Sequence, residues 1–171
     1  MTVLAASRRT PALAISRARL IEANINPDTG LATDYLNHFN EAIMMVELVP
    51  QVPECIEDLR AWRPLSYCEH FSASKFKERE LAITAYELAE PALRRRLDEI
   101  AACMNALLLS TTAAMAAASP DARAAIAAGT LAQLRSLIAR AGAVIHGAGA
   151  ATVATAEADA AQSAVDALFE R

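Results

Sequence analysis

Apolar residues recur every three or four positions along most of the chain, with polar residues between them. The clearest example lies between residues 31 and 49, where the apolar members are Leu31, Tyr35, Phe39, Ala42, Ile43 and Val46. This spacing matches the turn of an α-helix. Runs that alternate apolar and polar residues, which are typical of β-strands, are missing. The pattern therefore predicts an all-α protein.

Proline, glycine and capping residues divide this pattern into separate helices. Thr10 followed by Pro11 is typical of a helix start, and the turn-forming residues 24–30 end that helix. Residues 66–74 are expected to form a connector with one helical turn at most. The predicted helices cover residues 10–23, 31 or 33 to 49, 54–62, 75–89, 91–118, 130–144 and 156–169, and Pro120 could start a further short helix that ends at residue 128.

The helices together predict a multi-helix bundle of about five to seven helices with no sheet. A chain of 171 residues suits a single domain with its own core. We expect one helical domain over residues 1–171, in which 1–112 form the main bundle and 113–171 an Ala-rich helical part. The core is expected to come from the second helix, the helix at 75–89 and the long helix after Pro91.

A run from Ile100 to Pro120 contains no charged residue and is long enough to cross a bilayer. Most of its residues are Ala, which contributes little to membrane insertion, and only Leu107, Leu108 and Leu109 form a strongly apolar group. The centre of a soluble bundle also requires a helix that is apolar on all sides. We interpret the run as a core helix, with a membrane span as the alternative, and expect no membrane partner.

The formal net charge of −4 and the pI near 5.4 provide no global basic field, so we expect no nucleic acid partner. Local basic groups exist. They are Arg8, Arg9, Arg17 and Arg19 near the start and Arg94, Arg95 and Arg96 in the middle. Arg96 is followed closely by Asp98 and Glu99, which favours a solvated helix face over a phosphate-binding patch.

Three cysteines, an odd number without C-x-x-C spacing, favour reduced thiols over a disulfide framework. The twin arginines Arg8 and Arg9 resemble an export signal, but charged residues interrupt the apolar stretch that must follow them. These observations predict a cytoplasmic protein. The abundance of Ala and Arg suggests a bacterial genome of high G+C content.

Common catalytic and nucleotide-binding motifs are absent from the sequence, and only three histidines are present. Asp34, His38 and Glu41 lie within roughly 60° of one another on the second predicted helix, so they form one stripe beside its apolar face. Met45 and Leu48 continue this stripe, which suggests that it is covered. A carboxylate and an imidazole in register can hold a ligand or metal. They can also be ordinary surface residues in i,i+4 contact.

The segment from Trp62 to Phe71 has the most varied chemistry in the chain. It contains the candidate ligand-binding residues Trp62, Tyr67, Cys68, Glu69 and His70. Loops held between helices often carry function. Aromatic residues that fill one end of a bundle are the structural alternative. For Cys68, the neighbouring carboxylate argues against a reactive thiolate.

Two functional hypotheses follow. The first is a non-enzymatic protein that uses its Ala-rich C-terminal helices to associate with a second copy, as a homodimer, or to bind a protein partner. The second is a small-ligand or metal-binding bundle that uses Asp34, His38 and Glu41 together with Glu69 and His70. The second requires the two segments to converge within a few ångströms. No cofactor can be assigned from the sequence, and the order His38-x-x-Glu41 is the reverse of the di-iron pattern.

Overall fold

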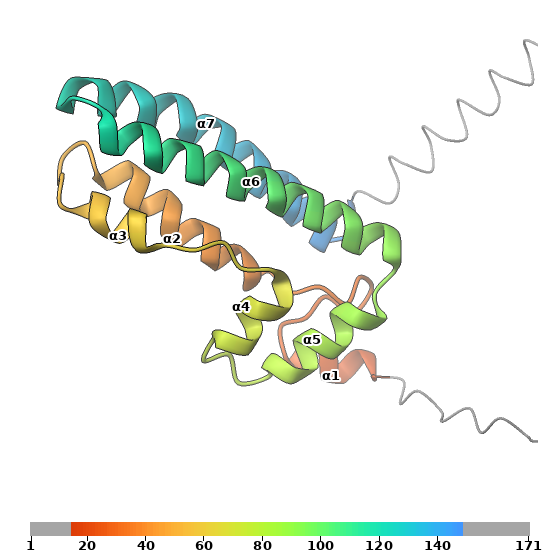
Figure 1. Ribbon diagram of the computed structural model, residues 1–171. Coiled ribbons are helices and arrows are strands. Elements are labelled where there is room, and N and C mark those ends of the chain that lie inside the picture. Colours follow the sequence, from red (N-terminus) through yellow and green to blue (C-terminus); the bar gives the residue numbers. More distant parts are fainter. Residues whose placement is uncertain (1–14, 149–171) are drawn as a thin grey trace, which may run out of the picture.

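The computed structural model describes residues 15–148, which form seven helices and no strand. The prediction of an all-α multi-helix bundle is confirmed. Helices α6 (Pro91–Ala117) and α7 (Pro120–Ile145) form a long antiparallel hairpin (Figure 1). Helix α2 (Tyr35–Leu48) packs against α7, and the short α3 (Cys55–Ala61) packs against α2 and α6. The bundle therefore has two layers, α6 with α7 and α2 with α3.

Three shorter helices gather at the end of the bundle where α2 begins (Figure 1). They are α1 (Arg17–Glu22), α4 (Tyr67–Ala73) and α5 (Arg79–Leu88). Helix α5 packs chiefly against α4, and α4 also contacts α2. The expectation that the core comes from α2, the 75–89 helix and α6 is correct in part. Helix α5 adds Ala82 and Ala85 to the core, but α7 is the helix that packs along α2 and α6.

One continuous hydrophobic core runs through both layers and into the group of short helices. Burial of such large apolar side chains provides most of the driving force for folding. The largest fully buried members are Tyr35, Tyr67, Phe39, Phe71, Ile25, Leu31, Leu59, Leu97, Met104, Leu108, Met115 and Leu134.

Helix α7 is one continuous helix, whereas the sequence predicted two helices separated at Gly129. Gly129 lies on the exposed side of α7 and no atom of another element lies within 4 Å of a Cβ placed there. Glycine weakens a helix without breaking it. Packing against α6 compensates, and Thr130 is buried there with its Oγ1 3.1 Å from Thr111 Oγ1.

Residues 67–73 form helix α4, whereas the sequence predicted a connector with one turn at most. The reason is a capping box that the prediction overlooked. Ser66 Oγ accepts a hydrogen bond from Glu69 N, and the Glu69 carboxylate accepts one from Ser66 N at 2.8 Å. This reciprocal pair satisfies two backbone donors at the helix start.

The predicted turn at residues 24–30 is present, with positive φ at Asn24 (55°) and Gly30 (71°). Thr29 Oγ1 donates a hydrogen bond to the carbonyl of Ile145 at 2.6 Å, which joins the turn to the end of α7. Helix α1, capped by Ser16, is the described part of the helix predicted at 10–23. Residues 10–14 and the helix predicted at 156–169 lie outside the described residues.

Among the described helices, α6 alone is long and apolar enough to cross a membrane, with a mean hydropathy of 1.6 over its most apolar 18 residues. One third of that window is buried against the rest of the protein. A core helix of a soluble protein meets the same criterion, so hydropathy by itself does not distinguish the two interpretations.

Candidate functional site

Two histidines from different helices meet at the junction of α2 and α4. His38 lies on the second turn of α2 and His70 lies in α4, and their ring centroids are 5.9 Å apart. Asp34, at the N-cap position of α2, places its Oδ2 3.5 Å from His70 Nε2. The structure therefore brings Asp34, His38 and His70 together from the two segments that the sequence singled out.

Trp62 closes one side of this cluster. Its ring stacks on His38 with centroids 4.8 Å apart and an interplanar angle of 25°. Its Nε1 donates a hydrogen bond to the carbonyl of His38 at 3.2 Å. Trp62 is held there because α3 ends at Ala61 and Pro64 prevents the helix from continuing. The stack therefore fixes the position of the His38 imidazole ring in the cluster.

Burial keeps His38 uncharged. Only 7% of the residue is exposed, and this burial, together with the electrostatic effect of His70, lowers the pKa of His38 to about 4. A hydrogen bond with the backbone of Arg63 raises the pKa, but by less. Burial penalises the charged imidazolium because it is removed from water. At neutral pH His38 therefore has one nitrogen that donates and one that accepts.

The Nε2 atoms of both histidines are buried and have no hydrogen-bond partner among the described residues. The contact between His70 Nε2 and Asp34 Oδ2 is close enough for an ion pair when His70 is protonated, but it lacks hydrogen-bond geometry. Unpaired buried polar atoms are rare in folded proteins, and they identify this cluster as unusual.

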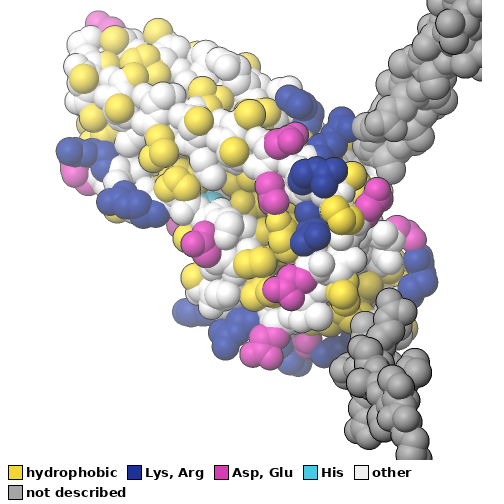
Figure 2. Space-filling model, turned by 45° about the vertical axis from the view of Figure 1, so that its right-hand side comes forward, with side chains coloured by type: hydrophobic (Ala, Val, Ile, Leu, Met, Phe, Trp, Pro, Cys, Tyr) yellow, Lys and Arg dark blue, Asp and Glu magenta, His cyan; other side chains and the backbone are white. Residues whose placement is uncertain are grey.

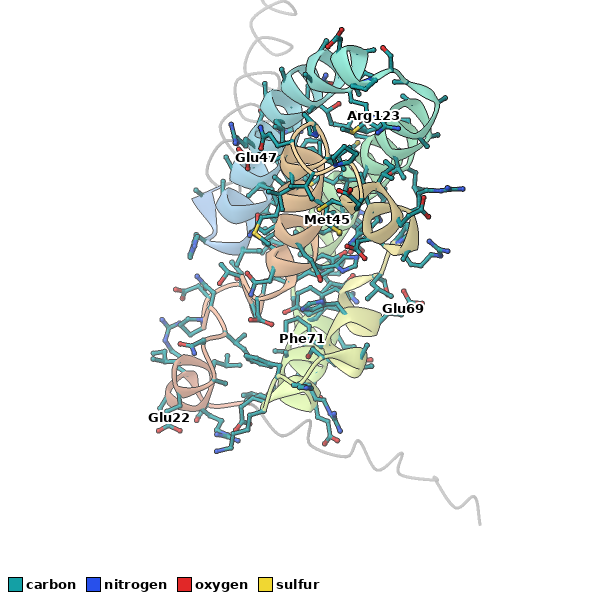
Figure 3. All side chains as sticks on the ribbon, turned by 90° about the vertical axis from the view of Figure 1, so that its left-hand side faces the viewer. Glu22, Met45, Glu47, Glu69, Phe71 and Arg123 are labelled. Carbon is teal, nitrogen blue, oxygen red and sulfur yellow. The ribbon has the colours of Figure 1, made fainter. Side chains whose placement is uncertain are left out.

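Tyr67 and Glu69, predicted as ligand-binding residues, have structural contacts. The hydroxyl of the buried Tyr67 accepts a hydrogen bond from Ala32 N at 2.9 Å, and its ring stacks on Tyr86 at 4.5 Å. Glu69 lies on the outer side of α4, where its carboxylate caps the helix (Figure 3). Neither residue contributes a group to the histidine cluster.

Cys68 lies in a different environment from the histidines. Burial, followed by the carboxylates of Glu87 and Asp98, raises the pKa of its thiol. These carboxylates belong to α5 and α6, so Cys68 is oriented toward those helices. A raised pKa leaves the thiol protonated at neutral pH and poorly nucleophilic.

A groove between α2 and α3 opens beside the cluster, with His38 and Trp62 in its wall and a volume of about 610 Å³. Its lining is largely apolar, and 59% of Met44 and 42% of Leu48 are exposed. The expectation that the stripe continuing through Met45 and Leu48 is covered holds for Met45, which packs partly buried against the core, and is wrong for Leu48. The other lining residues are Glu41, Met45, Asp58, Ala61, Arg63 and Leu65.

The sequence reasoning missed most of this groove. The labelled Met45 lies among the side chains between α2 and α3 (Figure 3), but nothing in the sequence specifies that these two helices form adjacent walls. The exposed Met44 is a signal that could have indicated it, because it lies at the edge of the apolar stripe of α2. Tyr35, whose ring lies 5.6 Å from His70, was also missed, because the pattern assigned it only to the core.

No group of three or more His, Cys, Asp or Glu side chains is arranged to hold a metal ion within residues 15–148. The pair of histidines with Asp34 does not form such a group. Comparisons with protein-family models, curated proteins and solved structures find no match for this chain. The fold and its candidate site therefore define a helical bundle with an open apolar groove.

Proposed function

We propose that this chain is a non-enzymatic binding module that takes an amphipathic helix of a protein partner into the groove between α2 and α3. The observation that carries the proposal is the row of apolar side chains left exposed there, with Met44 and Leu48 foremost. Contiguous exposed apolar surface marks interaction sites in soluble proteins. Methionine suits such surfaces because its flexible side chain adapts to different partners.

The shape of the groove favours a protein segment over a small molecule. Small-molecule sites usually enclose most of the ligand surface, whereas this groove is open to solvent along its length. Helix α2 lines the groove from His38 to Leu48, a distance of about 15 Å, which equals about three turns of a docked helix. A partner helix would place apolar anchors at i, i+4 and i+7 along it.

Charge indicates the chemistry of the partner. Glu41 on α2 and Asp58 on α3 stand on opposite sides of the groove, and neither forms an ion pair with another described residue. His38 is neutral, and the guanidinium of Arg63, which also lines the groove, donates hydrogen bonds to the carbonyls of Arg60 and Trp62. We therefore expect the partner helix to carry Lys or Arg beside its apolar anchors, because complementary charge speeds association and sets orientation.

Trp62 provides the assay, since it is the only tryptophan in the chain and lies in the groove wall. The probe is a synthetic Trp-free helical peptide of about 14 residues, the length of α2, with leucines at i, i+4, i+7 and i+11 and lysines on its flanks. We expect saturable changes in Trp62 fluorescence. A matched peptide with glutamates in place of the lysines should bind at least about tenfold more weakly.

A double substitution, Met44→Gln with Leu48→Gln, should weaken binding of the lysine peptide at least about tenfold, because it places polar amides against apolar anchors without changing the charge of the groove. Leu109→Gln is the matched control, since Leu109 is 49% exposed but belongs to α6. Equal loss in the control, or no saturable change with the original protein, would refute the proposal. Sedimentation of the protein alone tests self-association: a dimer lost in the double variant would mean that a second copy occupies the groove.

A small-ligand site remains a second candidate because Asp34, His38 and His70 converge and two imidazole nitrogens lack partners. Glu41 lines the adjacent groove, whereas Glu69 is engaged in capping. Metal analysis of the purified protein tests the metal-binding form. Stoichiometric metal that disappears in His38→Ala would favour this candidate, and metal-free protein would favour the partner-binding proposal.

A further inference from the structure

A second groove, in the other layer, collects cationic side chains from two helices. It lies between the first three turns of α6 and the last part of α7, with a volume of about 430 Å³. Arg95 and Arg96 of α6 and Arg140 of α7 line it. The apolar lining includes the half-buried Leu137 and Ile100, of which 4% is exposed. The site therefore combines three guanidinium groups with a small apolar area.

These charges are not neutralised within the described part of the chain. Arg95, Arg96 and Arg140 form no ion pair with residues 15–148, and one carboxylate, that of Glu99, also lines the groove. Glu99 follows Arg95 and Arg96 by four and three positions, so it can compensate one guanidinium at most. In Figure 2 Lys and Arg side chains lie where the long hairpin meets the shorter helices, with Asp and Glu side chains among them, while the far end of the hairpin is mainly hydrophobic or uncharged.

Arg95 and Arg96 are the fifth and sixth residues of α6 and therefore lie beyond its first turn. The partial positive charge of a helix start acts mainly within the first turn, so it has little effect on these two arginines. Their charges are therefore free to act on a bound anion in the groove.

We propose that this arginine groove binds a small phosphorylated molecule that carries an apolar or aromatic group. Guanidinium groups form paired, charge-assisted hydrogen bonds with phosphoryl oxygens. Arg95, Arg96 and Arg140 hold the phosphoryl group, and Ile100 and Leu137 contact the apolar part. The carboxylate of Glu99 accepts a hydrogen bond from a hydroxyl or amino group of the ligand.

The size and charge of the protein distinguish this ligand from a nucleic acid. Both grooves have volumes within the range of about 300–1,000 Å³ that is common for small-molecule sites, and both are open, so the three guanidinium groups rather than the shape select the ligand here. A nucleic acid would instead require a basic surface extending over several phosphates. The formal net charge of −4 means that the basic groove is surrounded by an acidic protein, which repels long polyanions.

Calorimetry of the full chain with phenyl phosphate, inorganic phosphate and phenol tests the proposal. We expect saturable binding of phenyl phosphate, weaker binding of inorganic phosphate and no binding of phenol. Arg95→Gln with Arg140→Gln should weaken phenyl phosphate binding at least about tenfold. Arg135→Gln is the matched control, because Arg135 is an exposed arginine of the same helix, α7, that pairs with Glu47 at 3.1 Å.

Three results would overturn the proposal. The first is the absence of saturable phenyl phosphate binding at low salt. The second is an equal loss of binding in Arg135→Gln, which would indicate a general charge effect. The third is binding to phosphatidylglycerol vesicles without binding of phenyl phosphate, which would assign the arginines to a lipid surface. Circular dichroism of each variant confirms that the helices remain folded.

Discussion

Replacing His38 by Phe should remove a defined part of the pH dependence of folding. The buried imidazole has a pKa of about 4, against 6.5 for an exposed histidine. As pH falls below 6.5, the unfolded chain takes up this proton before the folded one does. The stability contributed by neutral His38 is therefore complete above pH 6.5 and is lost progressively as pH falls toward 4.

The magnitude follows from the difference between the two pKa values. Each pH unit between them corresponds to about 1.36 kcal/mol, so the wild-type chain should lose about 2 to 3 kcal/mol of unfolding free energy between pH 7 and pH 4.5 through this group. Phenylalanine keeps a ring beside Trp62 but cannot take up a proton. The difference in unfolding free energy between wild type and His38→Phe should therefore change by that amount over the same pH range.

Urea unfolding at several pH values measures this difference. Other groups near His38, namely His70, Asp34, Glu41 and Arg63, are present in both proteins, so effects that do not involve His38 cancel in the comparison. His146→Gln is the control, because it removes an exposed histidine at the end of α7 and leaves His38 in place. If wild type and His38→Phe lost stability in parallel as pH falls, the assignment of a buried, neutral His38 would be wrong.

Further predictions concern glycines and a buried hydroxyl pair, and thermal or urea unfolding measures each one. Gly30→Ala should destabilise the protein by about 1–3 kcal/mol, because φ is +71° and the new Cβ would lie 2.9 Å from the carbonyl oxygen of Ala85. Gly129→Ala should stabilise it by about 0.5–1 kcal/mol, since that helical position has free space; destabilisation there would contradict the continuous α7. Thr111→Val should cost about 1–3 kcal/mol by leaving the hydroxyl of Thr130 unpaired, and adding Thr130→Val should recover part of the loss. A double variant that loses the sum of both single effects would show that the two hydroxyls do not interact.

The periodic pattern was sufficient to predict the fold class and most helices. It succeeded for α2 and α6 because their buried residues repeat at helical spacing and prolines or turn residues end them. It failed at α4, where the Ser66–Glu69 capping box was present in the sequence but overlooked. It also failed at Gly129, because packing between α6 and α7 overrides the weak helix preference of glycine.

The candidate site was only partly predictable because it depends on tertiary packing. Helical geometry places Asp34 and His38 on one stripe, and that relation needs no knowledge of the fold. The approach of His70 depends on how α4 packs against α2, which no local pattern specifies. The groove depends in the same way on α3 lying beside α2, so the exposed positions of Met44 and Leu48 became visible only in the assembled bundle.

The two proposed sites should act independently, because they belong to different layers of the bundle. The peptide groove has walls from α2 and α3, and the arginine groove has walls from α6 and α7, with no shared lining residue. Sites without shared partners usually have additive energies to within about 0.5 kcal/mol, and charges further apart than about 8 Å are largely screened at physiological salt. Saturating phenyl phosphate should therefore change peptide affinity by less than about twofold.

Fluorescence titration of Trp62 with and without phenyl phosphate measures this coupling, and calorimetry with and without peptide measures it in the opposite direction. Any real coupling must be equal in both directions, because binding free energies around a closed cycle sum to zero. A reciprocal change larger than about tenfold would contradict independence. It would require α7, which packs against both α2 and α6, to have two arrangements that the ligands select between.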